Sequence, residues 1–246
     1  MKRLLILLLS ACCLQVAAQP YPAKPVRLVV GFVPGGGTDI MARAVATKLG
    51  EIASIQMVVE NRPGANANLA AELVARSPAD GYSVLMMSTS HAISKPLYKT
   101  LKYDLEKDLV PVAFVSSGAM SVVVHPAVPA NTLSELIALA RAKPGELSYG
   151  SAGSGSPEHM AAELLISMAK IRMVHVPYKG GAASATDLIG GQIQVGFNTM
   201  PVAAPLAARW RCSRRPCWTR ATTRTRSASS KAFKVSGGVC GRSIIL

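Results

Sequence analysis

The chain has 246 residues, half of them apolar, and a formal net charge of +14, so it is long enough for two modest domains with real cores. Ten of the 27 Lys and Arg residues fall in the last 38 positions, which hold no acid, and the five cysteines lie only there and in the first 13 positions. The nearly neutral, cysteine-free remainder excludes a disulfide framework, a thiolate metal site and a polyanion-binding body.

Residues 1–18 have the pattern of a secretory signal peptide. A charged start, Lys2-Arg3, precedes the apolar run that opens at Leu4–Leu9, and the small residues of Val16-Ala17-Ala18 follow. The apolar stretch is too short to cross a bilayer, so we expect export to the periplasm with cleavage near Ala18. Leu9-Ser10-Ala11-Cys12 resembles a lipobox, which leaves a lipid anchor on Cys12 as the alternative.

From Val26 onward, short apolar runs alternate with stretches of helical spacing. Val26–Phe32 is a continuous apolar run, typical of a strand buried on both faces, and Thr38 is the expected N-cap of the helix that follows. The elements predicted in the first half are strands at Val26–Phe32, Met57–Val59, Tyr82–Met87 and Val110–Val115, and helices at Asp39–Leu49 and Asn68–Arg76.

The second half repeats this alternation. A capping box at Thr132–Glu135 opens a helix that runs to about Ala142, and Pro157 occupies the first position of the next helix. The other elements predicted here are strands at Ser121–His125, Leu147–Gly150, Met173–Val176 and Ile193–Phe197, and a helix at Ala183–Ile189. The pattern predicts an α/β fold with parallel sheets, in two lobes at 19–120 and 121–208 with a cleft between them.

Residues 209–246 break the pattern, with no helical or strand period before Ser243. We interpret them as an aberrant, disordered basic tail. If the arginines use CGN codons, Arg209-Trp210-Arg211-Cys212 read from the third base of each codon becomes an apolar, strand-like run. The tail is therefore hypothesised to be a frameshift product, which sequencing of the gene would test.

A glycine-rich turn joins the first predicted strand to the first predicted helix. Free backbone N–H groups and the helix dipole favour an anion at such a position. The turn nearly matches a phosphate loop, but it lacks the Lys that would neutralise a nucleotide phosphate. We therefore predict a site for a small carboxylate, with a flexible connector as the alternative, at Pro34, Gly35, Gly36, Gly37, Thr38 and Asp39.

A second Gly/Ser turn also lies between a strand and a helix. If it faced the first turn across a cleft, the two would hold a dicarboxylate or an amino acid through N–H groups and hydroxyls. Its candidate residues are Ser151, Gly153, Ser154, Gly155 and Ser156, and the set also includes Ser88, Thr89 and Asn198, which follow two predicted strands.

The sequence offers no catalytic constellation. Its histidines, His91, His125, His159 and His175, share no metal-ligand spacing, and no Gly-x-Ser-x-Gly motif is present. We therefore expect no enzyme activity, no cofactor and no metal. The alternatives are an α/β enzyme that holds a phosphorylated substrate at the first turn, with Asp39 as its acid–base candidate, and a nucleic-acid-binding protein that uses the arginine-rich tail.

Several stretches follow one another in the order and spacing of a known family. They are Tyr21 to Val30, Pro34 to Asp39 with Ala42-Arg43, Val59 to Ala65, Asp80-Gly81-Tyr82, Tyr149 to Ser156 with His159, His175 to Gly180, and Asp187 to Gln192. Over residues 21–208, the chain thus resembles the tripartite tricarboxylate transporter substrate-binding proteins, also called the Bug family.

The resemblance implies a two-lobed periplasmic binding protein fold of type II that closes on a small carboxylate, a di- or tricarboxylate or an amino acid. It implies a monomer that delivers this ligand to the membrane permease subunits of the transporter and binds no nucleic acid. Gly31 and Val33 stand where the family usually has prolines, and Asn66 and Asn68 replace usual glycines. Family members continue well beyond Ala208, so we expect the C-terminal part of the fold to be missing and the chain to be a defective, truncated version.

Overall fold

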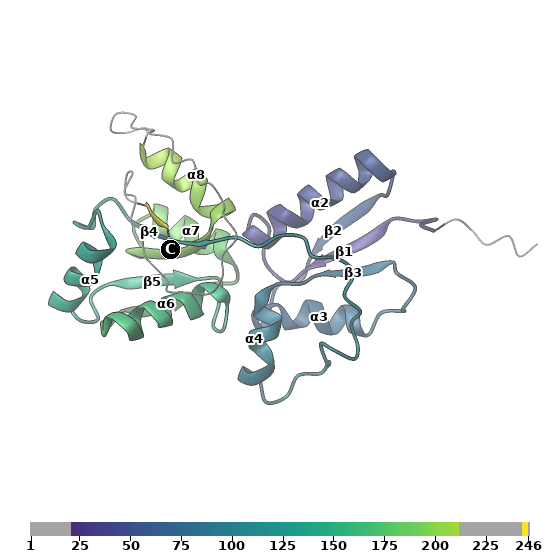
Figure 1. The fold of residues 1–246 in the computed structure, drawn as a ribbon, viewed down its shortest axis with the longest axis horizontal. Helices are drawn as coiled ribbons and strands as arrows, with labels where there is room; N and C mark the ends of the chain where they lie inside the picture. The colour runs from purple at the N-terminus through teal and green to yellow at the C-terminus, as the bar shows by residue number, and fades with distance from the viewer. Residues whose placement is uncertain (1–20, 212–242, 246) are drawn as a thin grey trace, which may run out of the picture.

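The computed structural model describes residues 21–211 and 243–245. The predicted signal peptide, Cys12 and positions 212–242 of the predicted tail lie outside the described residues. Figure 1 shows two lobes side by side, joined by an extended segment that crosses from one to the other. Within the described ranges, no helix is both long and apolar enough to cross a membrane.

Lobe 1 is a three-stranded parallel sheet in the order β2-β1-β3, with a helix on each face. Successive side chains of a strand point to opposite faces. Leu28 and Val30 therefore pack toward Ala42 of the first helix, whereas Val29 packs toward Ala70 of the second. The elements are β1 (Val26–Val30), α2 (Gly37–Ala53), β2 (Met57–Asn61), η2 (Ala65–Ala67), α3 (Asn68–Ala75), β3 (Ser83–Met86) and α4 (Thr89–Leu97).

Lobe 2 has a five-stranded sheet in the order β6-β5-β7-β4-β8, covered on both faces. The helices α5 and α6 pack on one face through Leu136 and Ala162, and α7 and α8 pack on the other through Leu188 and Leu206. The elements are β4 (Met120–Val124), α5 (Leu133–Ala142), β5 (Ser148–Ser151), α6 (Pro157–Ala169), β6 (Val174–Pro177), α7 (Gly181–Ile189), β7 (Val195–Thr199), α8 (Met200–Arg211) and β8 (Ser243–Ile245).

The structure confirms the two-lobed α/β fold and most predicted elements to within a few residues, with two differences in detail. The strand β4 runs antiparallel to β7, because it enters lobe 2 from the crossing segment and not through a helical crossover. The N-cap prediction for Thr38 is wrong. The helix α2 already begins at Gly37, and Gly36 occupies the N-cap position.

The predicted strand Val110–Val115 is not formed. Its residues belong to the extended segment that crosses between the lobes (Figure 1), and Val110, Val112 and Phe114 are each more than 80% exposed. An alternating apolar pattern yields a strand only where a neighbouring backbone accepts it. The described sheet of lobe 1 ends at β3, and Pro111 removes one of the donors that a ladder would need.

Four elements fall where the sequence predicted none. One is the short 3-10 helix η2, and two are the helices α4 and α8, the latter of which continues to Arg211, three residues into the predicted tail. Near the end of that tail, Ser243–Ile245 forms β8, which pairs antiparallel with β4.

Candidate functional site

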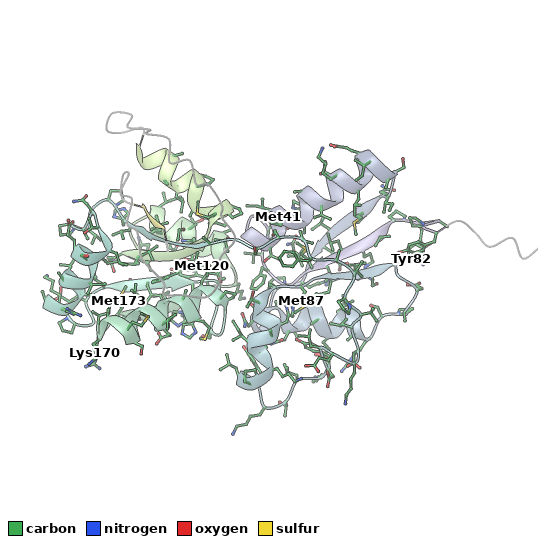
Figure 2. All side chains as sticks on the ribbon, in the orientation of Figure 1. Met41, Tyr82, Met87, Met120, Lys170 and Met173 are labelled. Atoms are coloured by element: carbon green, nitrogen blue, oxygen red, sulfur yellow. The ribbon has the colours of Figure 1, made fainter. Side chains whose placement is uncertain are left out.

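The two lobes meet at the carboxyl ends of their parallel strands, a contact zone called the lobe boundary below. The first turn (Val33–Asp39) follows β1, and the second turn (Ser151–Ser156) follows β5. Four helices, α2, α4, α6 and α7, begin at this boundary, and Met41 and Met87 lie beside it (Figures 1 and 2). Carboxyl ends of strands and N-terminal ends of helices are where α/β proteins bind anions.

The first turn is held by a buried carboxylate. Asp39 is 2% exposed. Its Oδ2 accepts from the Gly35 N–H and from Arg43 Nε, each at 2.9 Å, and its Oδ1 accepts from Asn61 Nδ2 at 2.8 Å. Burial raises the pKa of Asp39, but these hydrogen bonds and the Arg43 charge outweigh it and lower the pKa overall. Asp39 thus uses both oxygens to shape the turn.

The first turn contacts lobe 2 through its glycines. A Cβ added at Gly37 would lie 2.2 Å from Thr199 Oγ1, and one at Gly36 would lie 3.9 Å from the Gly181 nitrogen. The Val33 N–H also donates to the Lys179 carbonyl oxygen at 3.4 Å. Only a residue without a side chain allows this approach at Gly37. The partners of the first turn are therefore the end of β7 and the start of α7.

The second turn is held by side chains of its own lobe. Ser156 Oγ caps α6 by accepting from the His159 N–H at 3.2 Å. The Gly155 N–H donates to His159 Nδ1 at 3.1 Å, and Ser151 Oγ lies 2.7 Å from His175 Nε2. These histidines therefore hold the turn through hydrogen bonds. Among the described residues, no cluster of three His, Cys, Asp or Glu is placed to hold a metal ion.

The second turn faces a strained part of lobe 1. A Cβ added at Gly155 would lie 2.9 Å from Leu97 Cδ1 and 3.2 Å from Asn66 Nδ2. Ala65, Asn66 and Ala67 all have positive φ, at 47°, 54° and 72°. Such a backbone costs a non-glycine residue about 1–2 kcal/mol, and strain of this kind gathers at functional sites. It also explains why a glycine would suit position 66.

The two lobes carry buried polar side-chain atoms that have no hydrogen-bond partner in the described part of the chain. In lobe 1 they are Asn66 Oδ1, Ser90 Oγ and His91 Nε2, and in lobe 2 they are Ser184 Oγ, Asn198 Nδ2 and Asn198 Oδ1. Each such atom costs about 1–3 kcal/mol when it stays unpaired, so buried groups of this kind are rare. They mark places where a polar ligand or water completes the structure.

Asn198 stands out among these residues. It is 0% exposed, both atoms of its amide group are unpaired, and a Cβ added at Gly181, the first residue of α7, would lie 3.7 Å from its Oδ1. The oxygen of this amide thus lies toward the start of α7 and its Nδ2 lies toward Gly196 of β7, so the group offers an acceptor and a donor that a polar ligand or water can use.

The predicted site residues lie at the lobe boundary, but they have different roles and exposures there. Asp39 and Ser156 hold the turns, the side chains of Thr89 and Ser154 are exposed, and Ser88 caps α4, accepting at its backbone oxygen and donating its N–H to His91 Nδ1. The sequence reasoning missed Asn66, Ser90, His91 and Ser184 as unpaired polar groups. Only Asn66 gave a signal, as a departure from the glycine usual in the resembling family.

One acidic group beside the second turn is unusual. Glu158, at the start of α6, is 7% exposed, and burial raises its pKa against the lowering effect of hydrogen bonds from its own backbone and from Ser156. The surroundings of Glu158 therefore disfavour its charged form relative to a carboxylate in water.

Comparison with known proteins places these features in a family. Residues 41–214 match the family model described as the tripartite tricarboxylate transporter family receptor. Protein BugT of Bordetella pertussis is 36% identical over 188 residues, which are 76% of this chain and 58% of that protein. The UPF0065 protein in the tcbD-tcbE intergenic region of Pseudomonas sp. (strain P51) is 34% identical over 180 residues, which are 73% of this chain and 54% of that protein.

Solved structures agree. A protein of R. palustris solved with adipate superimposes with a TM-score of 0.74 at 35% identity, and MatC of Rhodopseudomonas palustris, solved with malate, superimposes with 0.69 at 27%. The periplasmic binding protein BugD gives 0.71 at 28% identity. The match covers 77% of this chain and 63–64% of each of these proteins, so the chain spans less than two thirds of its relatives.

Proposed function

Because this chain belongs to the tripartite tricarboxylate transporter family receptors, we propose that it is an extracytoplasmic solute-binding protein that captures a small carboxylate at the lobe boundary. The observation that carries the proposal is Asn198, a fully buried amide beside the first turn of α7 whose side chain has no hydrogen-bond partner among residues 21–211 and 243–245. Four helix N-termini at one boundary supply the positive potential for an anion.

The ligand class is a di- or tricarboxylate or an acidic amino acid. Adipate and malate are bound by the solved relatives, and both have two carboxylates separated by a short carbon chain. Such a ligand reaches from the first turn in lobe 1 to Asn198 and Ser184 in lobe 2. Ser184 supports this reading, because it lies in the first turn of α7 and its buried Oγ has no hydrogen-bond partner within the described part of the chain.

The finer parts of the proposal follow from the receptor role. The protein acts as a periplasmic monomer, exported by residues 1–18, and delivers its ligand to membrane permease subunits without catalysing a reaction. Lipidation at Cys12 is the alternative form of export. The absence of turnover of phosphoesters, measured together with carboxylate binding, distinguishes this role from that of an α/β enzyme.

The test is a calorimetric titration of the whole chain with adipate and malate, with the adipate-binding relative as positive control. We expect 1:1 binding that Asn198→Ala weakens at least tenfold, about 1.4 kcal/mol, whereas the exposed Asn131→Ala leaves it unchanged. If neither adipate nor malate produces a heat of binding with this chain while the relative binds adipate, the proposal is contradicted. That result is also what the sequence-based expectation of a defective, truncated chain predicts, so the titration decides between the two.

A further inference from the structure

Two histidines of lobe 2 hydrogen-bond residues of the second turn. The rings of His159 on α6 and His175 on β6 are stacked, with centroids 4.1 Å apart and planes 16° apart. His175 stacks in turn on Tyr149 of β5, at 4.9 Å and 19°. The rings form a column under the second turn, and each imidazole bonds one residue of that turn, Gly155 or Ser151.

Protonation of the imidazole affects the Ser151–His175 and Gly155–His159 hydrogen bonds differently. Ser151 Oγ lies within 3.2 Å of both the N–H and the carbonyl oxygen of Gly153. Its hydroxyl can therefore donate to His175 Nε2, or accept from a protonated Nε2 and donate to Gly153. The bond between Gly155 and His159 has no such freedom. The Gly155 N–H donates to Nδ1, and an imidazolium carries a proton on that nitrogen.

The column also limits where a proton can reside. Two imidazolium rings face to face repel each other, whereas one charged ring over a neutral ring is attracted. Burial first, and the charge of His159 second, lower the pKa of His175, while Glu163 opposes them. Of the two rings, His159 has its Nε2 within ion-pair range of a carboxylate, 3.8 Å from Glu163 Oε1, whereas Nε2 of His175 lies against the Ser151 hydroxyl.

The other charged and titratable groups near the pair lie on the elements packed around it. Tyr149 donates to the same Glu163 oxygen at 2.5 Å, and burial raises the pKa of Glu158. β7 has no titratable side chain. On α4, which contacts α6, Lys95 pairs with Glu106, and burial lowers the pKa of His91. On α5, Arg141 bonds the Ala169 oxygen at the far end of α6, and Glu135 accepts from the Asn131 N–H.

We propose that His159, stacked on His175, is a positioning residue for the second turn, and that its protonation in mild acid releases the Gly155 amide and weakens ligand binding. The inference rests on the proposed function, because the second turn is one wall of the carboxylate site. Gly155 is buried, so its freed N–H has no ready replacement partner, and the loss of such a bond changes an equilibrium about five- to tenfold.

The test measures the dissociation constant for adipate at pH 7.5 and pH 5.5 in the full chain and three variants. The wild-type constant should rise about five- to tenfold in acid. His159→Asn keeps an acceptor near the position of Nδ1 but does not titrate, so it should bind well at pH 7.5 with a smaller rise. Titration of adipate itself affects both proteins equally and cancels in this comparison.

The remaining variants separate position from charge. His159→Phe keeps a stacked ring without an acceptor and should bind weakly at both pH values. His125 follows β4 and accepts from the Ala127 N–H through Nδ1, away from the second turn. His125→Asn should therefore keep the wild-type pH profile. An equal rise in wild type and His159→Asn would overturn the proposal while leaving carboxylate binding intact.

A measurement without ligand keeps the inference apart from the proposed function. In nuclear magnetic resonance spectra of the full chain, the protection factor of the Gly155 amide should fall severalfold as the His159 ring protons titrate. If adipate does not bind but the protection factor of the Gly155 amide falls as His159 is protonated, the receptor proposal fails and the positioning role stands. If that protection factor does not change when His159 is protonated, the positioning role is refuted, with or without adipate binding.

Discussion

The two lobes are built from the same strand-turn-helix units but are stabilised to different degrees. Lobe 2 buries its sheet under helices on both faces, and Thr132 and Ser156 cap α5 and α6 through their side chains. Lobe 1 has a three-stranded sheet and small clusters, α2 and α3 lack a side-chain cap, and Val58 and Leu69 are about half exposed. Lobe 2 is therefore the self-sufficient half, and lobe 1 depends more on contacts across the boundary.

The largest effect should come from the lobe 2 core. Phe197 is 0% exposed and meets Tyr149 edge to face at 5.7 Å, so Phe197→Ala should cost about 3–5 kcal/mol of unfolding free energy in urea. Phe114, which is 83% exposed in the crossing segment, is the matched control. Phe114→Ala should stay within about 0.5 kcal/mol. Similar costs at both positions would mean that the crossing segment is buried in solution.

The second effect concerns the close approach of the lobes. Gly37→Ala places a Cβ against Thr199, and we expect about 1–3 kcal/mol of strain at the boundary, seen as weaker adipate binding. Gly118→Ala is the control, because a Cβ there meets nothing within 4 Å. If Gly37→Ala binds adipate as tightly as Gly118→Ala, the contact between the first turn and β7 does not form.

How much of this comparison the sequence predicts depends on how local each feature is. The turns at Gly35 and Gly155 are encoded by their own residues and the helices that follow, so both were predicted. The strand predicted at Val110–Val115 does not form, because a strand also needs a neighbouring backbone to pair with. The unpaired Asn66 and Ser184 were missed for the same reason, since only the apposition of distant segments makes them buried and partnerless.

A third prediction concerns Asp39 in the first turn. Asp39→Asn should cost about 2 kcal/mol, because it weakens charged hydrogen bonds to Arg43 and Gly35. The folded-state pKa of Asp39 lies below its usual value of 3.8. Its contribution is thus complete above that pH and is lost as the pH falls through the folded pKa, so wild type and variant should converge in strong acid.

Thermal unfolding at several pH values measures this difference. The exposed Asp80, which pairs with Lys24 at 3.8 Å, provides the control, since Asp80→Asn should change stability by less than about 1 kcal/mol at any pH. A gap between wild type and Asp39→Asn that persists unchanged into acid would show that ionisation of Asp39 does not hold the first turn.

The smallest effect tests the strain in lobe 1. Ala65 is exposed and has a φ of 47°, so Ala65→Gly should raise the unfolding free energy by up to about 1 kcal/mol. Ala44→Gly, at an exposed position inside α2, should lower it by about 1 kcal/mol. Urea unfolding of both variants measures these opposite signs, and a loss of stability in Ala65→Gly would refute the strained backbone.

The most direct test of a ligand site shared by both lobes is hydrogen–deuterium exchange of the whole chain with and without adipate. We predict slower exchange in three stretches, 33–39, 151–156 and 180–184, and unchanged exchange in 110–119. Protection confined to one lobe, or no change in any of the three stretches at saturating adipate, would contradict the account.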